Sequence, residues 1–295
     1  MVSDILTIRD VGADAIREIL ALSQQPDFGR PLAGKGVALV FQKPSARTRN
    51  SMEMATVQLG GHPVYIQKDE VGFGSRETLE DVTRTLACYH AIIAARVMEH
   101  EQLDRIAAAT TAPVINMLSD TDHPLQALAD LLTMQQLIGS LAGVRVAYVG
   151  DANNVARSLA QGCAALGIEL RIASPAGYGF SREELESFGG VVLQTEDPCA
   201  AAEGAQFVYT DVWVSMGQDD EDGIRRKALA PYQVNEALMA RTDDAWFMHC
   251  LPARRGQEVT EAVIDGKRSV IWRQAENRMH SARGAMLWLL GAGSS

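Results

Sequence analysis

Three cations stand within the seven residues KPSARTR (43–49), directly after a strand-like apolar run and at the start of a helical pattern. The first N–H groups of a helix lack partners and carry the positive end of the helix dipole, so such a turn attracts anions. The hydroxyls of Ser45 and Thr48 and the guanidinium of Arg47 add donors suited to phosphoryl oxygens. These features favour a phosphate site over a capped helix with solvated arginines. The segment is not a P-loop, because it lacks the glycines and the G-K-[ST] ending.

Further polar residues follow two other strand-like runs of the first half. In HPLQ, His123 and Gln126 are three residues apart at a helix start, so both can face one carbonyl or phosphate. A histidine beside a proline is more often a cap or a packing residue. This one, however, follows a predicted parallel strand, at the sheet edge where α/β proteins bind ligands. Arg96 stands at a similar strand end, where a lone arginine would otherwise be a surface ion pair.

Two turns of the second half combine glycine, amide and carboxylate groups. The turn GDANN (150–154) has one of the three glycines of a dinucleotide fingerprint, which disfavours a nicotinamide-dependent dehydrogenase. Asn154 suits either a carboxylate ligand or the cap of the following helix. Asp211 and Ser215 suit a substrate ammonium, although a solvated loop has the same composition. The polar loop that follows, at 218–226, has a length typical of a mobile lid.

Cys250 lies in HCLP (249–252), at the end of another predicted strand. Most cysteines are small core residues, but a thiol beside a histidine and a proline turn at a strand end is a plausible functional group. No spacing of cysteine, histidine and carboxylate resembles a zinc site, so we expect no metal. Arg278, in ENRMH (276–280), either returns to the ligand cleft or merely begins the final helix.

Strand-like runs and helical patterns alternate along the chain, which is typical of βαβ units and parallel sheets. The predicted strands span residues 37–41, 63–66, 91–95 and 114–116, then 144–149, 170–173, 191–194, 207–209 and 246–249. The predicted helices include 47–59, 79–89, 124–138 and 274–290. We therefore predict an α/β fold of two open parallel-sheet domains joined by interdomain helices. The boundary falls near residue 140, and ligands are expected at a shared cleft.

The composition excludes several classes of protein. The chain has 295 residues, of which 47% are hydrophobic and 22% charged, as in ordinary globular proteins of two domains. A formal net charge of −10 argues against nucleic-acid and anionic-membrane surfaces. The 4 cysteines are scattered and read as free thiols of a reducing compartment. No uncharged stretch is long enough to span a membrane, and the first residues resemble no targeting signal, so we expect a cytoplasmic protein.

Taken in order, these segments resemble the aspartate/ornithine carbamoyltransferase family over essentially the whole chain. The matching segments are SARTR (45–49), HPLQ (123–126), the GD and NN of 150–154, Asp211 with SMG (215–217), HCLP (249–252) and ENR (276–278). The SMG loop and the cysteine of HCLP resemble the ornithine branch. The resemblance implies a carbamoyl-phosphate domain (1–140, with the final helix, about 274–295, packed back on it) and an ornithine domain (141–273). It also implies a homotrimer of catalytic chains, or larger assemblies of trimers, and a role in arginine biosynthesis.

The resemblance also implies a role for each matching residue. It places the phosphate on Ser45, Ala46, Arg47 and Thr48 and the carbamoyl group on Arg96, His123 and Gln126, with Arg278 binding carbamoyl phosphate from the far wall. Asn154, Asp211, Ser215 and Met216 would hold the α-carboxylate and α-amine of ornithine. Cys250 and Leu251, which also border the carbamoyl phosphate, would orient the attacking amine. The implied catalytic residues are Arg96, His123 and Cys250, and no cofactor is implied.

Departures from the family pattern keep other functions open. Ala46 stands where the family usually has threonine, and Leu125 replaces a small or polar residue. The loop around 70–77 lacks the usual glutamine or lysine that reaches a neighbouring subunit, and Arg76 is its nearest substitute. The alternatives are a carbamoyltransferase for putrescine or an N-acylated ornithine, and a catalytically weak relative that binds or regulates a partner. Asp211 and Asn154 favour a free amino acid over putrescine, which has no carboxylate.

Overall fold

The computed structural model describes residues 4–71, 77–214 and 223–291. Its contacts divide the chain into two compact units, Met1–Leu132 with Glu276–Ser295, and Thr133–Ala275. Two helices, α6 (Pro124–Ile138) and α13 (Ile271–Leu289), contribute residues to both units. Among the described residues, no helix is both long and apolar enough to cross a membrane.

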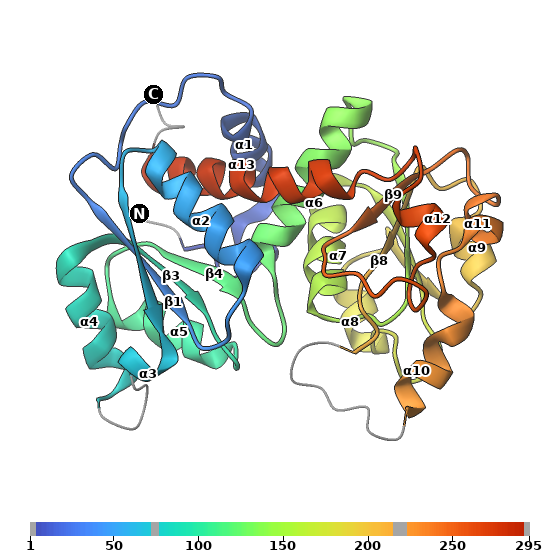
Figure 1. The fold of residues 1–295 in the computed structure, drawn as a ribbon, viewed down its shortest axis with the longest axis horizontal. Helices are drawn as coiled ribbons and strands as arrows, with labels where there is room; N and C mark the ends of the chain where they lie inside the picture. The colour runs from blue at the N-terminus through green and yellow to red at the C-terminus, as the bar shows by residue number, and fades with distance from the viewer. Residues whose placement is uncertain (1–3, 72–76, 215–222, 292–295) are drawn as a thin grey trace. The chain divides into compact units, whose positions relative to one another are not determined.

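The first unit is built on a parallel 4-stranded sheet of order β2-β1-β3-β4 (Figure 1). Its strands are β1 (Gly36–Phe41), β2 (His62–Gln67), β3 (His90–Arg96) and β4 (Val114–Leu118). The other helices that belong to this unit are α1 (Ile8–Ser23), α2 (Ala46–Gln58), α3 (Lys68–Val71), α4 (Leu79–Tyr89) and α5 (Glu101–Ala109). Strands β1 and β3 are almost wholly buried, as expected of parallel strands covered on both faces.

Helices cover both faces of this sheet. One face packs on α4 and α5 (Figure 1), and the core between them includes Val40, Val82 and Ile106. On the other side of the sheet, α13 lies very close to α1, because a Cβ on Gly284 would be 2.1 Å from the Ser23 Oγ. The Nη2 of Arg283 donates to the Ser23 carbonyl at 2.9 Å and fixes the same contact. The C-terminal part of α13 is thereby held on the first unit.

The second unit is built on a parallel 5-stranded sheet of order β7-β6-β5-β8-β9. Its strands are β5 (Arg145–Val149), β6 (Glu169–Ala173), β7 (Val192–Thr195), β8 (Phe207–Thr210) and β9 (Trp246–His249). Its helices are α7 (Asn154–Leu166), α8 (Arg182–Ser187), α9 (Pro198–Ala202), α10 (Ile224–Leu229), the 3-10 turn η1 (Ala230–Tyr232), α11 (Glu236–Met239) and α12 (Glu261–Ile264). One core cluster packs the sheet against α9, α11 and α12. Chain order reverses between β5 and β8, so ligands are expected beside these two strands.

The predicted fold class and every predicted strand are confirmed, with bounds that agree to within one or two residues. The helices at 79–89 and 124–138 have the predicted bounds, and the one expected at 47–59 is α2, Ala46–Gln58. The last helix begins at Ile271 rather than at residue 274. The helix begins earlier because the buried side chain of Ile271 packs in the core of the second unit.

Candidate active site

The anion-binding turn of the first unit joins β1 to α2. Ser45 is the N-cap of α2, where its Oγ accepts from the Thr48 N–H at 3.4 Å and donates to the Thr48 Oγ1 at 3.2 Å. Thr48 is buried, Arg47 is half-buried and Ala46 is exposed at the first helical position. The turn therefore opens a helix N-terminus of the kind that binds anions. Arg49, the last cation of the segment, pairs instead with Glu53 at 2.8 Å and stacks on the Tyr65 ring.

Arg96 lies beside this turn because of strand register. It is the last residue of β3 and pairs with Phe41, the last residue of β1, and its carbonyl accepts from the Gln42 N–H at 2.9 Å. The side chain is only 5% exposed. In the described part of the chain, its Nε is buried with no hydrogen-bond partner. Burial, together with the charges of Arg278 and Arg47, lowers the Arg96 pKa to about 10. A buried donor among like charges is stabilised by a bound anion.

His123 comes directly before α6 and is equally buried. Burial lowers its pKa well below 6.5, and the charges of Arg278, Arg96 and Arg47 lower it further. The ring is therefore neutral near pH 7. The influence of these three arginines on one imidazole also places all four groups in one cluster of the first unit. We call Arg47, Arg96, His123 and Arg278 the cation cluster.

Arg278 enters the cation cluster from the interior of α13, and α6 anchors it. Its Nη1 donates to the Gln126 Oε1 at 2.6 Å, and the Gln126 Nε2 donates to the Asp130 Oδ1 at 2.8 Å. All three residues are buried. Sequence reasoning missed Asp130, although it stands four residues after Gln126 and therefore on the same face of α6.

In the second unit, Asp211 and Cys250 meet at the ends of neighbouring strands. Thr210 of β8 pairs with His249 of β9, so the residues that follow them are adjacent. The Cys250 Sγ donates to the Asp211 Oδ1 at 3.0 Å, and the Asp211 carboxylate is buried. Leu251, the next residue, has a positive φ of 60°. The arrangement presents a thiol and a carboxylate at the carboxyl edge of the sheet.

Asn153, and not Asn154, caps α7. The Asn153 Oδ1 accepts from the N–H groups of Val155 and Ala156, and its Nδ2 donates to the Asp211 Oδ2 at 2.7 Å. The proposal that Asn154 serves as the cap is therefore wrong, because its neighbour makes these bonds. Asn154 is the first residue of α7 and is half-buried. The preceding turn requires glycine, since Gly150 has a φ of 134°.

His249 holds the Cys250 turn in place by hydrogen bonds. Its Nδ1 accepts from the Leu251 N–H at 2.8 Å, so its Nε2 carries the proton and donates to the buried Glu258 Oε1 at 3.1 Å. Donor atoms of Asp211, His249 and Cys250 lie within 4.8 Å of one another, a spacing that would suit a metal ion. Both ring nitrogens of His249 are already hydrogen-bonded, however. The geometry favours a hydrogen-bonded group over a ligand set.

An arginine that sequence reasoning missed ties the turn after β5 to α10. The Arg225 Nη2 donates to the Asp151 carboxylate at 2.6 Å and its Nε donates to the Trp213 carbonyl at 2.6 Å. Burial raises the Asp151 pKa, and Arg225 opposes that shift. Ser215 and Met216, which the sequence predicts to be ornithine ligands, lie outside the described residues, as does Arg76.

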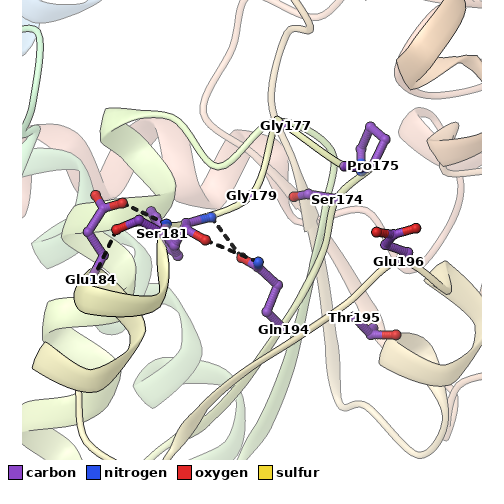
Figure 2. Close-up of a pocket in the computed structure, with 11 residues that line it drawn as sticks. Ser174, Pro175, Gly177, Gly179, Ser181, Glu184, Gln194, Thr195 and Glu196 are labelled. Carbon is purple, nitrogen blue, oxygen red and sulfur yellow. Dashed lines mark hydrogen bonds between the residues drawn. The ribbon is translucent and has the colours of Figure 1, made fainter.

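A cavity of about 620 Å³ opens elsewhere in the second unit, beyond the ends of β6 and β7 (Figure 2). Its polar groups largely bond to one another. The Gln194 amide binds both backbone groups of Phe180, and Ser181 and Glu184 form a reciprocal helix cap. None of the predicted site residues lines this cavity. This cavity therefore does not bring together the residues that the sequence predicts to carry the chemistry.

We predict that the neutral state of His123 makes the first unit less stable in acid. Below about pH 6.5 an unfolded histidine binds a proton that the folded His123 does not bind. The free energy of unfolding therefore decreases as the pH is lowered below that value. Above that pH this contribution is constant. In thermal unfolding at pH 5, 6, 7 and 8, His123→Asn should lose less stability between pH 7 and pH 5 than the unsubstituted protein. The exposed His62, replaced by asparagine, is the control, and equal losses in all three proteins would contradict the prediction.

Comparisons with known proteins match both halves of the chain to one family. Residues 3–136 match the family model described as the aspartate/ornithine carbamoyltransferase carbamoyl-P binding domain, and residues 142–289 match its Asp/Orn binding domain. An ornithine carbamoyltransferase of Hyperthermus butylicus is 45% identical over 97% of both chains. An anabolic ornithine carbamoyltransferase of Pyrococcus furiosus is 42% identical over 98% of this chain and 96% of its own.

Solved structures give the same result. The structure of ornithine carbamoyltransferase from Pyrococcus furiosus aligns with a TM-score of 0.93 at 41% identity, covering 98% of this chain and 97% of that one. The Thermus thermophilus enzyme aligns with a TM-score of 0.90 at 42% identity, covering 97% and 98%. The chain belongs to the aspartate/ornithine carbamoyltransferase family.

Proposed function

We propose that this protein is an ornithine carbamoyltransferase, which transfers the carbamoyl group of carbamoyl phosphate to the side-chain amine of L-ornithine and yields L-citrulline and phosphate. The observation that carries the proposal is the cation cluster, in which the charges of three arginines act on one neutral imidazole. Such a concentration of positive charge, with Arg96 and Arg278 buried, suits a small dianion. The names of the relatives support the choice of ornithine as the second substrate.

Carbamoyl phosphate would bind to the first unit through its two ends. Its phosphate would lie on the α2 turn, held by Ser45, Ala46, Arg47 and Thr48. Its carbonyl oxygen would face Arg96 and His123, which donate to it. Cys250 and Leu251 of the second unit would also border the carbamoyl phosphate. We assign the carbamoyl-phosphate domain to residues 1–140 with the final helix, and the ornithine domain to residues 141–273.

The reaction needs positioned donors and a neutral amine. The amine nitrogen of ornithine attacks the carbonyl carbon, and the new C–N bond leaves negative charge on the carbonyl oxygen. Arg96 and His123 stabilise this oxyanion, an effect worth a few kcal/mol for each preorganised donor, or about 2.7–4 kcal/mol in measured cases. The C–O bond to phosphate then breaks, and phosphate leaves with the bonding pair and accepts the proton that the attacking amine loses. Holding both substrates in place contributes the proximity effect.

The second unit would recognise ornithine by its charges. Asn154 would hold the α-carboxylate, and Asp211, with Ser215 and Met216, would hold the α-amine. Cys250 would orient the side-chain amine. Putrescine has no carboxylate for Asn154, and an N-acylated ornithine has no α-ammonium for Asp211. This pair of groups therefore favours ornithine over both.

A direct assay separates these possibilities. Ureido product is measured from carbamoyl phosphate with ornithine, putrescine, N-acetylornithine and aspartate in parallel. We expect turnover with ornithine and little with the other amines. Turnover with another amine alone would overturn the ornithine pocket while leaving the phosphate site in place. No turnover with any of them would favour a relative that only binds or regulates a partner.

We also propose a homotrimer formed through the first unit. Strand β2 lies at the edge of its sheet, and the neighbouring helix α2 exposes Met54 (48%) and Val57 (51%). An open strand edge beside exposed apolar side chains is a surface suited to a second copy of the chain. Light scattering should give the mass of a trimer or of a multiple of trimers, and Val57→Arg should lower it. A monomer in both proteins would contradict this proposal.

The proposal also covers the compartment of the enzyme and the direction in which it works. We propose a cytoplasmic enzyme of arginine biosynthesis, supported by the scattered free cysteines and by the anabolic relative.

A further inference from the structure

The Gln126 side-chain amide lies between a pure hydrogen-bond donor and a pure acceptor. Its Oε1 accepts from the Arg278 guanidinium at 2.6 Å, and its Nε2 donates to the Asp130 carboxylate at 2.8 Å. A guanidinium has no acceptor, and a carboxylate has no donor. Only one orientation of the amide satisfies both neighbours, so the oxygen must face Arg278 and the nitrogen must face Asp130.

This orientation decides what Gln126 can offer a ligand. Arg278 belongs to the cation cluster, since its charge lowers the pKa of both Arg96 and His123. The Gln126 oxygen therefore lies on the cluster side of the amide, and it has a second lone pair beyond the one that Arg278 uses. Arg96 and His123 donate hydrogen bonds, whereas this oxygen accepts them. The cluster thus combines donors for a carbonyl oxygen with one acceptor for an N–H group.

We infer that Asp130 is a positioning residue that selects the carbamoyl group: its carboxylate holds the Gln126 amide so that the oxygen accepts a hydrogen bond from the NH2 of the acyl phosphate. This inference rests on the proposed function. Acetyl phosphate has nearly the same shape and the same carbonyl and phosphate groups, but a methyl group replaces the NH2. Arg96, His123 and the α2 turn treat the two compounds alike, whereas the Gln126 oxygen distinguishes an NH2 group from a methyl group.

Asp130 is placed to hold the Gln126 amide and not to contact the substrate itself. It is fully buried on α6, one turn beyond Gln126, and its Oδ1 accepts from the Gln126 amide, which in turn bonds to Arg278 of the cluster. Once carbamoyl phosphate binds, Arg278 is drawn to the phosphate. The bond to Asp130 then keeps the amide from turning, which would present its NH2 to the substrate instead.

The test measures the ratio of the dissociation constants of acetyl phosphate and carbamoyl phosphate by titration calorimetry, with citrulline formation measured alongside. Asp130→Ala removes the acceptor, and the ratio should fall about tenfold, the size of one lost hydrogen bond. Asp130→Asn keeps an amide oxygen that can accept from Gln126, so its ratio should stay within about threefold of the original. Asp130→Ser, whose hydroxyl is too short for the 2.8 Å contact, should behave as Asp130→Ala does and replaces it if that variant does not fold.

Two controls separate positioning from loss of structure. Leu128→Ala removes a buried apolar side chain from the same helix and should change both dissociation constants by the same factor, leaving the ratio unchanged. In a Gln126→Ala background, Asp130→Ala should no longer alter the ratio, because the residue through which it acts is gone.

The outcomes distinguish this inference from the proposed function. A ratio that is unchanged in Asp130→Ala and Asp130→Ser overturns the role of Asp130, even if affinity for both acyl phosphates falls. An unsubstituted protein that makes no citrulline overturns the proposed function, and the binding ratio still decides the role of Asp130.

Discussion

Replacing Arg96 by alanine is expected to lower kcat by about a hundredfold to a thousandfold, the usual cost of removing one donor to a developing oxyanion. Arg96 is buried, and its Nε has no hydrogen-bond partner among the described residues, so a ligand is the natural acceptor. The backbone that carries it is fixed because the last residues of β3 and β1 are paired, and close packing around the buried side chain limits its movement. The donor is therefore preorganised, which is the condition under which electrostatic stabilisation of a transition state is large.

Stability should respond in the opposite direction. Arg96 is a buried charge whose pKa is lowered to about 10 by burial and by the neighbouring arginines, so the free protein is destabilised by it. Arg96→Ala should therefore keep or raise the melting temperature while activity collapses. Stability that is sacrificed for a binding site in this way is common in enzymes.

The measurement combines citrulline kinetics with thermal unfolding. Arg105→Ala is the matched control, because Arg105 is an exposed arginine of the same unit that pairs with Glu80 at 2.8 Å. It should leave kcat within about twofold, since surface ion pairs contribute little. If Arg96→Ala retained the activity of this control, the assignment of Arg96 to the carbonyl oxygen would be wrong.

The architecture of both units was predictable because it depends on local patterns. Buried parallel strands read as short apolar runs, and each run is followed by a turn and a helical pattern. Pairing of neighbouring strands in each sheet then brings Arg96 beside the α2 turn and Asp211 beside Cys250. Polar residues that directly follow strands were therefore identifiable as candidate ligands.

Contacts between residues far apart in the sequence were not predictable, nor was the choice between two neighbouring residues of the same type. Arg278 bonds to Gln126 across 152 positions of sequence, and no periodic pattern encodes that pairing. Asn153 and Asn154 have the same capping preference, and only the backbone geometry of the turn selects the first. No pattern in the sequence marks Glu258 for burial beside His249.

Asp211→Asn is expected to lower kcat/KM for ornithine by about a hundredfold to a thousandfold. The Asp211 carboxylate is buried and already accepts from Cys250, Asn153 and the Val212 N–H, which fixes its position. In the proposed complex it also faces the α-ammonium of ornithine. Asparagine keeps the shape but removes the charge, and truncating one partner of a buried charge pair costs about 2–5 kcal/mol.

This loss should be confined to the second substrate. Asp211 belongs to the second unit, whereas the cation cluster belongs to the first, so inhibition by inorganic phosphate should be unchanged. Asp265→Asn removes an exposed carboxylate of the second unit that pairs with Arg255, and it should leave both kinetic constants within about twofold. Steady-state kinetics with ornithine varied at saturating carbamoyl phosphate gives the answer. If Asp211→Asn weakened phosphate inhibition as strongly as it lowered kcat/KM for ornithine, the carboxylate would be a general structural element and not the group that recognises the amino acid.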